Sequence, residues 1–184
     1  SSGGIYPGAA VPGGTVGRMI GVVKTYCSRV GGGPFPTELH GETADAIRDR
    51  GNEYGTTTGR PRRCGWLDLF ALRYTAQLCG TTELACTGLS VLAGLDTLKL
   101  CVGYRHEGRD LPSFPANPAL LGAVEPVYEE LPAIGQPLED CTSYDDLPDA
   151  AREYLRFIAD FVGVPVGMAC VGRKRSQIIR IPNE

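Results

Sequence analysis

The nine residues from Gly55 to Arg63 (GTTTGRPRR) gather the side chains that proteins use to bind anions. The segment holds three threonines, two glycines and three arginines. An arginine binds a carboxylate or a phosphate through two parallel hydrogen bonds, threonine hydroxyls add short ones, and glycines let the backbone approach a ligand. The pattern therefore predicts an anion-binding loop. The alternative interpretation is a solvated basic loop without a ligand.

Other residues that could do chemistry favour structural roles. The segment Val30–Pro36 (VGGGPFP) is too short for a dinucleotide-binding fingerprint and lacks the lysine and hydroxyl of a phosphate-binding loop. We expect a rigid turn there, whose backbone can touch a ligand. His40 has no neighbouring nucleophile, and the acidic pairs Glu139–Asp140 and Asp145–Asp146 are typical of a solvated surface.

Composition excludes several function classes. The formal net charge is −3 and the pI is about 5.5, so no overall positive field attracts nucleic acid or a membrane surface. No apolar run approaches the length of a membrane span. The seven cysteines form no CxxC pair, which indicates reduced thiols in a cytosol-like compartment and no zinc site. Glycine (25) and proline (14) are abundant, and they predict many ordered loops.

The elements that position the arginine-rich loop follow from the spacing of apolar residues. Helices are expected at 15–26, 37–50 with Thr37 as N-cap, 66–78 and 149–162; strands at 83–91, 97–104, 124–128, 164–171 and 177–181; loops at 1–14 and 52–65. Helices and strands alternate, so the fold class is α/β. A length of 184 residues fits a single domain, 1–184.

Several long segments resemble one enzyme family. The longest are VVKTYCSRVGGGPFPTEL, which starts at Val22, and GNEYGTTTGRPRRCGWLDL, which starts at Gly51; shorter ones are CVGY at 101–104, FPAN at 114–117, VYEELP at 127–132 and REYLRFI at 152–158. From about Val22 to Ile181 the sequence resembles adenylosuccinate synthetase, the ligase of purine biosynthesis that joins aspartate to IMP at the expense of GTP. Motifs of this length are very unlikely to recur by chance.

The resemblance covers the C-terminal half of the family's chain. It implies part of a P-loop-type synthetase fold, with a mixed sheet, flanking helices and long ordered loops. The family's phosphate-binding loop, catalytic aspartate and catalytic histidine belong to its N-terminal half, and no GxxxxGK-like segment occurs here. We therefore expect no catalytic residue and no metal ligand in this chain, and the Mg²⁺ ligands in that other half. Ser1–Ser2 would end the segment that contacts the IMP phosphate.

The resemblance also implies a two-step reaction and assigns the arginine-rich loop to aspartate. The γ-phosphate of GTP passes to the 6-oxo oxygen of IMP, and the aspartate amine then displaces phosphate. The aspartate-binding loop would be Thr56, Thr57, Thr58, Gly59, Arg60, Pro61 and Arg62, with Thr58 and Arg60 on the carboxylates. Arg62 would also lie near the nucleotide phosphates, and the backbone of Val30 would touch the IMP ribose.

The guanine-binding positions are where the sequence departs from the family pattern. Family members carry Thr-Lys-Leu-Asp where this chain has Thr87, Gly88, Leu89 and Ser90, so a lysine and a carboxylate are missing. The second guanine-contacting turn corresponds to Cys170, Val171 and Gly172. Because charge-assisted hydrogen bonds contribute about twice as much as neutral ones, we expect the preference for GTP over ATP to fall by about 1 to 3 kcal/mol.

Three functions therefore stand at this stage. The first is an ordinary adenylosuccinate synthetase, which in its family is a cytoplasmic homodimer. The second is a relative with altered nucleotide choice, like the ATP-using enzymes that make 2-aminoadenylosuccinate. The third is a catalytically inactive binding domain. All three imply small-molecule ligands and neither nucleic acid nor a membrane.

Overall fold

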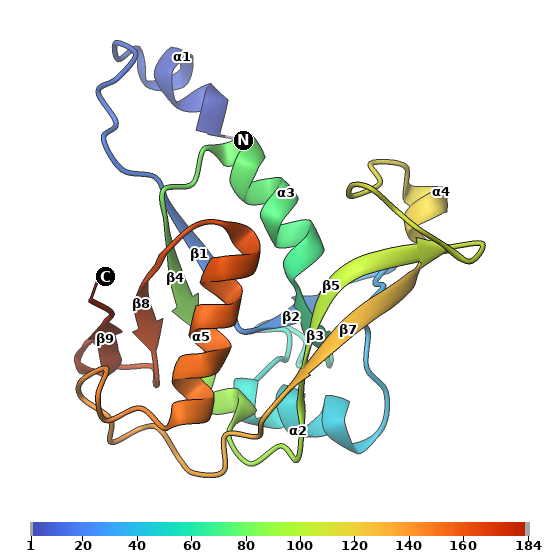
Figure 1. The fold of residues 1–184 in the computed structure, drawn as a ribbon, viewed down its shortest axis with the longest axis vertical. Helices are drawn as coiled ribbons and strands as arrows, with labels where there is room; N and C mark the ends of the chain where they lie inside the picture. The colour runs from blue at the N-terminus through green and yellow to red at the C-terminus, as the bar shows by residue number, and fades with distance from the viewer. Residues whose placement is uncertain (1, 183–184) are drawn as a thin grey trace.

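Two β-sheets and two long helices organise the chain (Figure 1). The computed structural model describes residues 2–182. The α-helices are α1 (Ile5–Ala9), α2 (Glu42–Gly51), α3 (Leu69–Cys79), α4 (Pro118–Leu121) and α5 (Asp149–Val162), and the 3-10 turns are η1 (Ser2–Gly4), η2 (Leu89–Leu92) and η3 (Arg175–Gln177). The strands are β1 (Ile20–Lys24), β2 (Tyr26–Arg29), β3 (Arg63–Asp68), β4 (Glu83–Thr87), β5 (Leu98–His106), β6 (Arg109–Asp110), β7 (Glu125–Leu131), β8 (Val166–Cys170) and β9 (Ile178–Arg180).

The first sheet brings three strand ends to one edge. Its order is β1-β4-β8-β9, with β1, β4 and β8 parallel and β9 antiparallel. The register pairs Lys24 with Thr87 and Cys86 with Ala169. The carboxyl ends of the three parallel strands therefore lie side by side, and loops that follow such ends are where α/β folds bind ligands.

The second sheet brings the loop after β2 to the same end as the arginine-rich segment, which precedes β3. Its order is β2-β3-β5-β6, and β7 pairs with β5. Strands β2 and β3 are antiparallel, with Arg29 opposite Arg63. The loop after β2 and the loop before β3 therefore leave the sheet at the same end.

Helix α5 covers the first sheet and packs against α3 (Figure 1). Its bounds match the predicted helix at 149–162, and the buried side chains on its inner face are Ala151, Tyr154, Leu155, Ile158 and Val162. The hydroxyl of fully buried Tyr154 donates a hydrogen bond to the Thr25 carbonyl at 2.6 Å. This bond fixes α5 to the short connection between β1 and β2. The α/β class predicted from the sequence is confirmed.

The helix predicted at 15–26 is wrong. This segment forms β1 and β2, which lie in different sheets. Its apolar residues recur at helical spacing, but Ile20, Val22 and Val23 are β-branched and pair in parallel with β4. Long-range strand pairing, which the sequence pattern does not record, decides the conformation.

Two other predicted helices start later in the structure. Helix α2 begins at Glu42 after Gly41, which adopts φ +72, and Thr37 is fully buried instead of capping a helix. The Thr37 carbonyl accepts a hydrogen bond from the Trp66 amide at 3.1 Å. The segment predicted as a helix from 66 to 78 starts as strand β3, and α3 begins only after Asp68. The Asp68 carboxylate caps α3 by accepting from the Ala71 amide at 3.0 Å.

The remaining differences concern element ends. The predicted strand 83–91 stops at Thr87 and continues as turn η2, while β7 extends beyond the predicted 124–128. The predicted loop at 1–14 contains the short turns η1 and α1. No helix among residues 2–182 is both long enough and apolar enough to cross a membrane.

Candidate functional site

The arginine-rich segment forms a closed hairpin with an open tip. Tyr54 and Pro61 pair as an antiparallel bridge, and the Gly55 amide donates to the Arg60 carbonyl at 2.8 Å. Gly59 adopts φ +65, a left-handed conformation that glycine tolerates without strain. The side chains of the tip residues are exposed, and they are Thr56, Thr57, Thr58 and Arg60. The hydroxyls and the guanidinium are therefore available to a ligand.

The three arginines of the segment have different surroundings. Arg63 forms an ion pair with Glu38 at 2.5 Å and donates to the carbonyls of Gly31 and Gly33, so it holds the glycine-rich loop. Arg62 donates from Nη1 to Glu53 Oε2 at 3.0 Å. Within residues 2–182, Arg60 has neither an ion pair nor a side-chain hydrogen bond. Arg60 is thus the arginine of the loop that is free for an anion.

A buried carboxylate anchors Arg62. Glu53 is 2% exposed and accepts from Lys24 Nζ at 2.5 Å, from Tyr26 Oη at 2.7 Å and from Arg62 Nη1 at 3.0 Å. Burial by itself raises the pKa of the Glu53 carboxyl, but the hydrogen bonds and the charge of Lys24 together bring that pKa below its usual value. The carboxylate stays ionised and orients two cations toward the same edge of the fold.

Replacing Glu53 by glutamine is expected to lower the free energy of unfolding by about 1.5 to 3 kcal/mol, the contribution of a hydrogen bond to a charged group. The amide keeps the shape but not the charge that holds Lys24 and Arg62. Because the folded pKa lies below the unfolded one, the contribution of Glu53 is present above the unfolded pKa, about 4.3. It is lost as the pH falls through the folded value. Urea unfolding at pH 7 and at pH 3 measures both effects.

The matched control is Glu130→Gln, which breaks an exposed pair with Lys99. Pairs of that kind contribute about 0 to 1 kcal/mol, so this variant should unfold almost like the parent chain. An equal loss of stability in the two variants, or a loss in Glu53→Gln that persists undiminished at pH 3, would contradict the role given to Glu53.

Val30 lies at the same end of the second sheet as the hairpin. Val30 directly follows β2 and Arg62 directly precedes β3, so both leave the end of the ladder at which Arg29 pairs with Arg63. Its side chain is 75% exposed. The predicted aspartate and IMP residues therefore lie in two loops that leave the same end of the β2–β3 ladder.

The predicted nucleotide residues gather at the edge of the first sheet. Gly88, Leu89 and Ser90 follow the end of β4; Cys170 is the last residue of its parallel neighbour β8, and Val171 and Gly172 follow it. Leu89 and Val171 are fully buried, backbone included, so neither presents a surface to a ligand in this structure. Gly88 adopts φ +77 and begins the η2 turn. Ser90 is half-buried.

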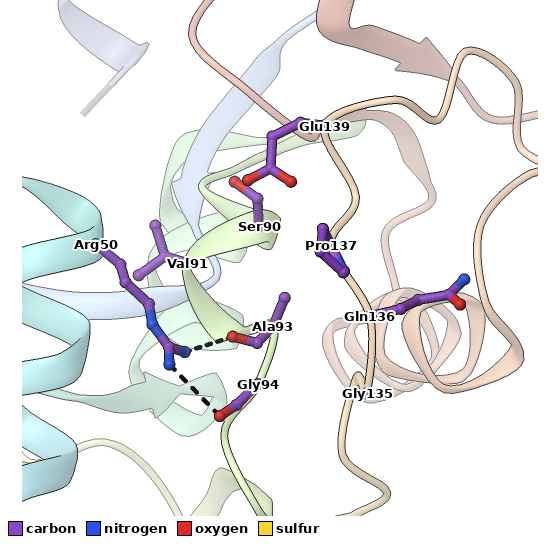
Figure 2. A pocket seen from close by; sticks show the side chains of 9 residues that line it. All are labelled: Arg50, Ser90, Val91, Ala93, Gly94, Gly135, Gln136, Pro137 and Glu139. Atoms are coloured by element: carbon purple, nitrogen blue, oxygen red, sulfur yellow. Dashed lines mark hydrogen bonds between the residues drawn. The ribbon is translucent and has the colours of Figure 1, made fainter.

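The segment around Glu139, which the sequence predicts to be solvated surface, reaches the same edge. The Gln177 side chain packs against Gly172 so closely that a Cβ there would collide with it, and its Nε2 donates to the Glu139 carbonyl at 3.1 Å. Glu139 and Ser90 both line a pocket of about 460 Å³ between η2 and the 135–139 loop (Figure 2). In the sequence, Glu139 and Asp140 are visible only as an acidic pair. The fold brings Glu139 to the pocket that Ser90 also lines.

One contact joins the two groups of predicted residues. A Cβ at position 88 would lie 3.1 Å from Tyr26 Cε1, so Gly88 sits against the Tyr26 ring. The hydroxyl of Tyr26 donates to Glu53, which holds Arg62. The nucleotide edge and the hairpin therefore share one packed unit.

The thiols and carboxylates do not form a metal or redox centre within residues 2–182. All seven cysteines are free, and no group of three histidine, cysteine, aspartate or glutamate side chains is arranged to hold a metal ion. Burial raises the pKa of Cys27 to about 11 and that of Cys86 to about 12, so both thiols stay protonated. The residues described here do not fit a Mg²⁺ site.

Comparison with known proteins decides the family. The family model described as adenylosuccinate synthetase matches residues 1–179. The chain belongs to the adenylosuccinate synthetase family. The synthetase of Salinibacter ruber is 49% identical over 179 residues, which are 97% of this chain and 41% of that protein. The synthetase of Symbiobacterium thermophilum is 54% identical over 177 residues, 94% of this chain and 41% of that protein.

A solved synthetase has the same fold. The structure of fully ligated adenylosuccinate synthetase from Plasmodium falciparum aligns with a TM-score of 0.93 at 35% identity, and the alignment covers 98% of this chain and 43% of that one. The chain thus spans about two fifths of the length of the synthetases it matches. Ser1, predicted with Ser2 to end the IMP-phosphate segment, lies outside the described residues, and Ser2 donates to the Cys79 carbonyl.

Proposed function

We propose that this chain is the aspartate-binding and base-binding part of an enzyme that ligates L-aspartate to IMP with GTP, giving adenylosuccinate, GDP and phosphate. The observation that carries the proposal is the hairpin at residues 55–62. It presents three hydroxyls and the free guanidinium of Arg60 beside an Arg62 that Glu53 holds in place. A substrate with two carboxylates needs such a combination of cations and hydroxyl donors.

The hairpin's role is to position the aspartate amine. Thr58 and Arg60 would hold the carboxylates, while Arg62 would pair with aspartate near the nucleotide phosphates. Val30, which leaves the same end of the β2–β3 ladder as Arg62, would meet the IMP ribose through its backbone. Fixing the amine in line with C6 of the phosphorylated IMP converts a bimolecular attack into an intramolecular one, which is a large source of rate.

The nucleotide would lie along the edge of the first sheet. Gly88, Ser90 and Gly172 border this edge, whereas the predicted positions Leu89 and Val171 are fully buried. We assign transfer of the γ-phosphate, and the Mg²⁺ that accompanies it, to the part of a synthetase outside this segment. No step on the present residues runs through a metal ion.

A cytoplasmic homodimer belongs to the same proposal. Seven unpaired cysteines among residues 2–182 support a reducing compartment, because disulfides form in oxidising ones. Light scattering of a synthetase-length chain measures the assembly, and a monomer would remove this part of the proposal.

The test is an assay on a synthetase-length enzyme that carries this segment, either natural or fused to the matching remainder of the Salinibacter ruber relative. With IMP, aspartate, GTP and Mg²⁺ we expect adenylosuccinate, GDP and phosphate in equal amounts. Leaving out aspartate should abolish adenylosuccinate. A folded enzyme that makes no adenylosuccinate would refute the proposal, as would one that joins IMP to another amine in preference to aspartate.

A further inference from the structure

The pocket between η2 and the 135–139 loop carries one guanidinium and one carboxylate, from Arg50 and Glu139. Its volume of about 460 Å³ is in the range of small-molecule sites. The cation on its wall, Arg50, is already occupied, because it donates to the carbonyls of Ala93 and Gly94 (Figure 2). The other polar side chains that line it are Ser90, Gln136 and Glu139. Glu139 is therefore the anionic side chain among the residues that line the pocket.

Two hydrogen bonds fix the position of Glu139, one to its carboxylate and one to its backbone carbonyl. Its Oε2 accepts from the Leu138 amide at 3.1 Å, and Leu138 itself is fully buried. Its backbone carbonyl accepts from Gln177, which packs against Gly172. In Figure 2 the carboxylate of Glu139 and the hydroxyl of Ser90 point to the same end of the pocket. The remaining carboxylate oxygen is free to accept from a ligand.

We propose that Glu139 is a specificity-determining residue that selects guanine over other purines at this edge. The inference rests on the proposed function, which brings a purine triphosphate here. A carboxylate can only accept hydrogen bonds, whereas the hydroxyl of Ser90 can donate or accept and so tolerates either base. Guanine presents adjacent N1–H and N2–H donors. Adenine has an acceptor at N1 and no 2-amino group, and hypoxanthine keeps N1–H but also lacks the amine.

The carboxylate therefore comes from a segment about 50 positions away from Ser90 in the sequence. The loss of GTP preference expected from the sequence is based on the segment Thr87–Ser90 alone. Glu139 is exposed at the mouth of the pocket, and its charge restores the discrimination by accepting from guanine hydrogen-bond donors that the other bases lack.

The experiment measures kcat/KM for GTP, ITP and ATP in the synthetase-length enzyme and in Glu139→Gln. ITP tests the 2-amino group alone. The unmodified enzyme should prefer GTP over ITP, and Glu139→Gln should reduce that ratio about 10- to 100-fold, the size of a charge-assisted hydrogen bond. The amide oxygen still accepts from Leu138, so the loop keeps its conformation. ATP should gain relative to GTP in the same variant.

Asp140→Asn is the matched control, since it removes the same charge one residue along and does not line the pocket. Its GTP to ITP ratio should equal that of the parent. Equal ratios in Glu139→Gln and the parent, or a parent that already prefers ATP, would overturn the inference while leaving ligation intact. If a folded enzyme ligates aspartate with no triphosphate at all, the proposed function falls and this inference falls with it.

Discussion

The 184-residue chain expressed alone is expected to give no adenylosuccinate above background from IMP, aspartate, GTP and Mg²⁺. Phosphoryl transfer is catalysed by positioning and by charge around the phosphates, and it needs a phosphate cradle, a metal site and a residue that orients the nucleophile. The sequence contains no GxxxxGK-like segment, and residues 2–182 gather no metal ligands. The expected effect is the loss of all measurable turnover.

The comparison is the synthetase-length enzyme assayed in parallel. A circular dichroism spectrum with the helix and strand content of the structure must accompany the result, so that inactivity is not confused with failure to fold. Turnover by the folded 184-residue chain would contradict this expectation, because residues of this chain would then have to supply the phosphate-binding and metal-binding groups.

The parts of the fold that the sequence predicted well are those with a strong local signal. Helix α5 has a continuous apolar face, and its predicted bounds hold. The segment at 15–26 has helical spacing too, but its residues pair with β4, a strand some 60 positions away along the chain. Local periodicity cannot register a partner at that distance, so strand pairing overrides it.

Some residues of the candidate site also have a local signal in the sequence, and others have none. The loop Thr56–Arg62 stands out by composition, and the structure adds that Arg63 is occupied while Arg60 is free. Glu53 and Glu139 carry no such signal, because a single carboxylate gains meaning only from its burial or its neighbours. Their roles depend on contacts with Tyr26 and Gln177, which the fold alone creates. The ligand roles of all these residues stay predictions.

In the synthetase-length enzyme, Arg60→Ala is expected to lower kcat/KM for aspartate by about 30- to 5,000-fold, equivalent to about 2 to 5 kcal/mol. Removing one partner of a desolvated charge pair leaves the substrate carboxylate unpaired. Arg60→Lys should recover little of the loss, since an ammonium cannot reproduce the planar fork. Steady-state kinetics with varied aspartate at saturating IMP and GTP measure the change.

Arg60 is well suited to this test because its side chain has no bonding partner within residues 2–182, so truncating it removes no contact that stabilises the fold. Backbone hydrogen bonds close the hairpin. In one of them the Arg60 carbonyl accepts from the Gly55 amide, and this bond does not depend on the side chain at position 60. Arg109→Ala, an exposed arginine on β6, is the matched control and should leave aspartate kinetics unchanged. Equal urea midpoints for the parent and both alanine variants would separate binding from stability. Unchanged aspartate kinetics in Arg60→Ala would then mean that the hairpin does not hold the aspartate carboxylates.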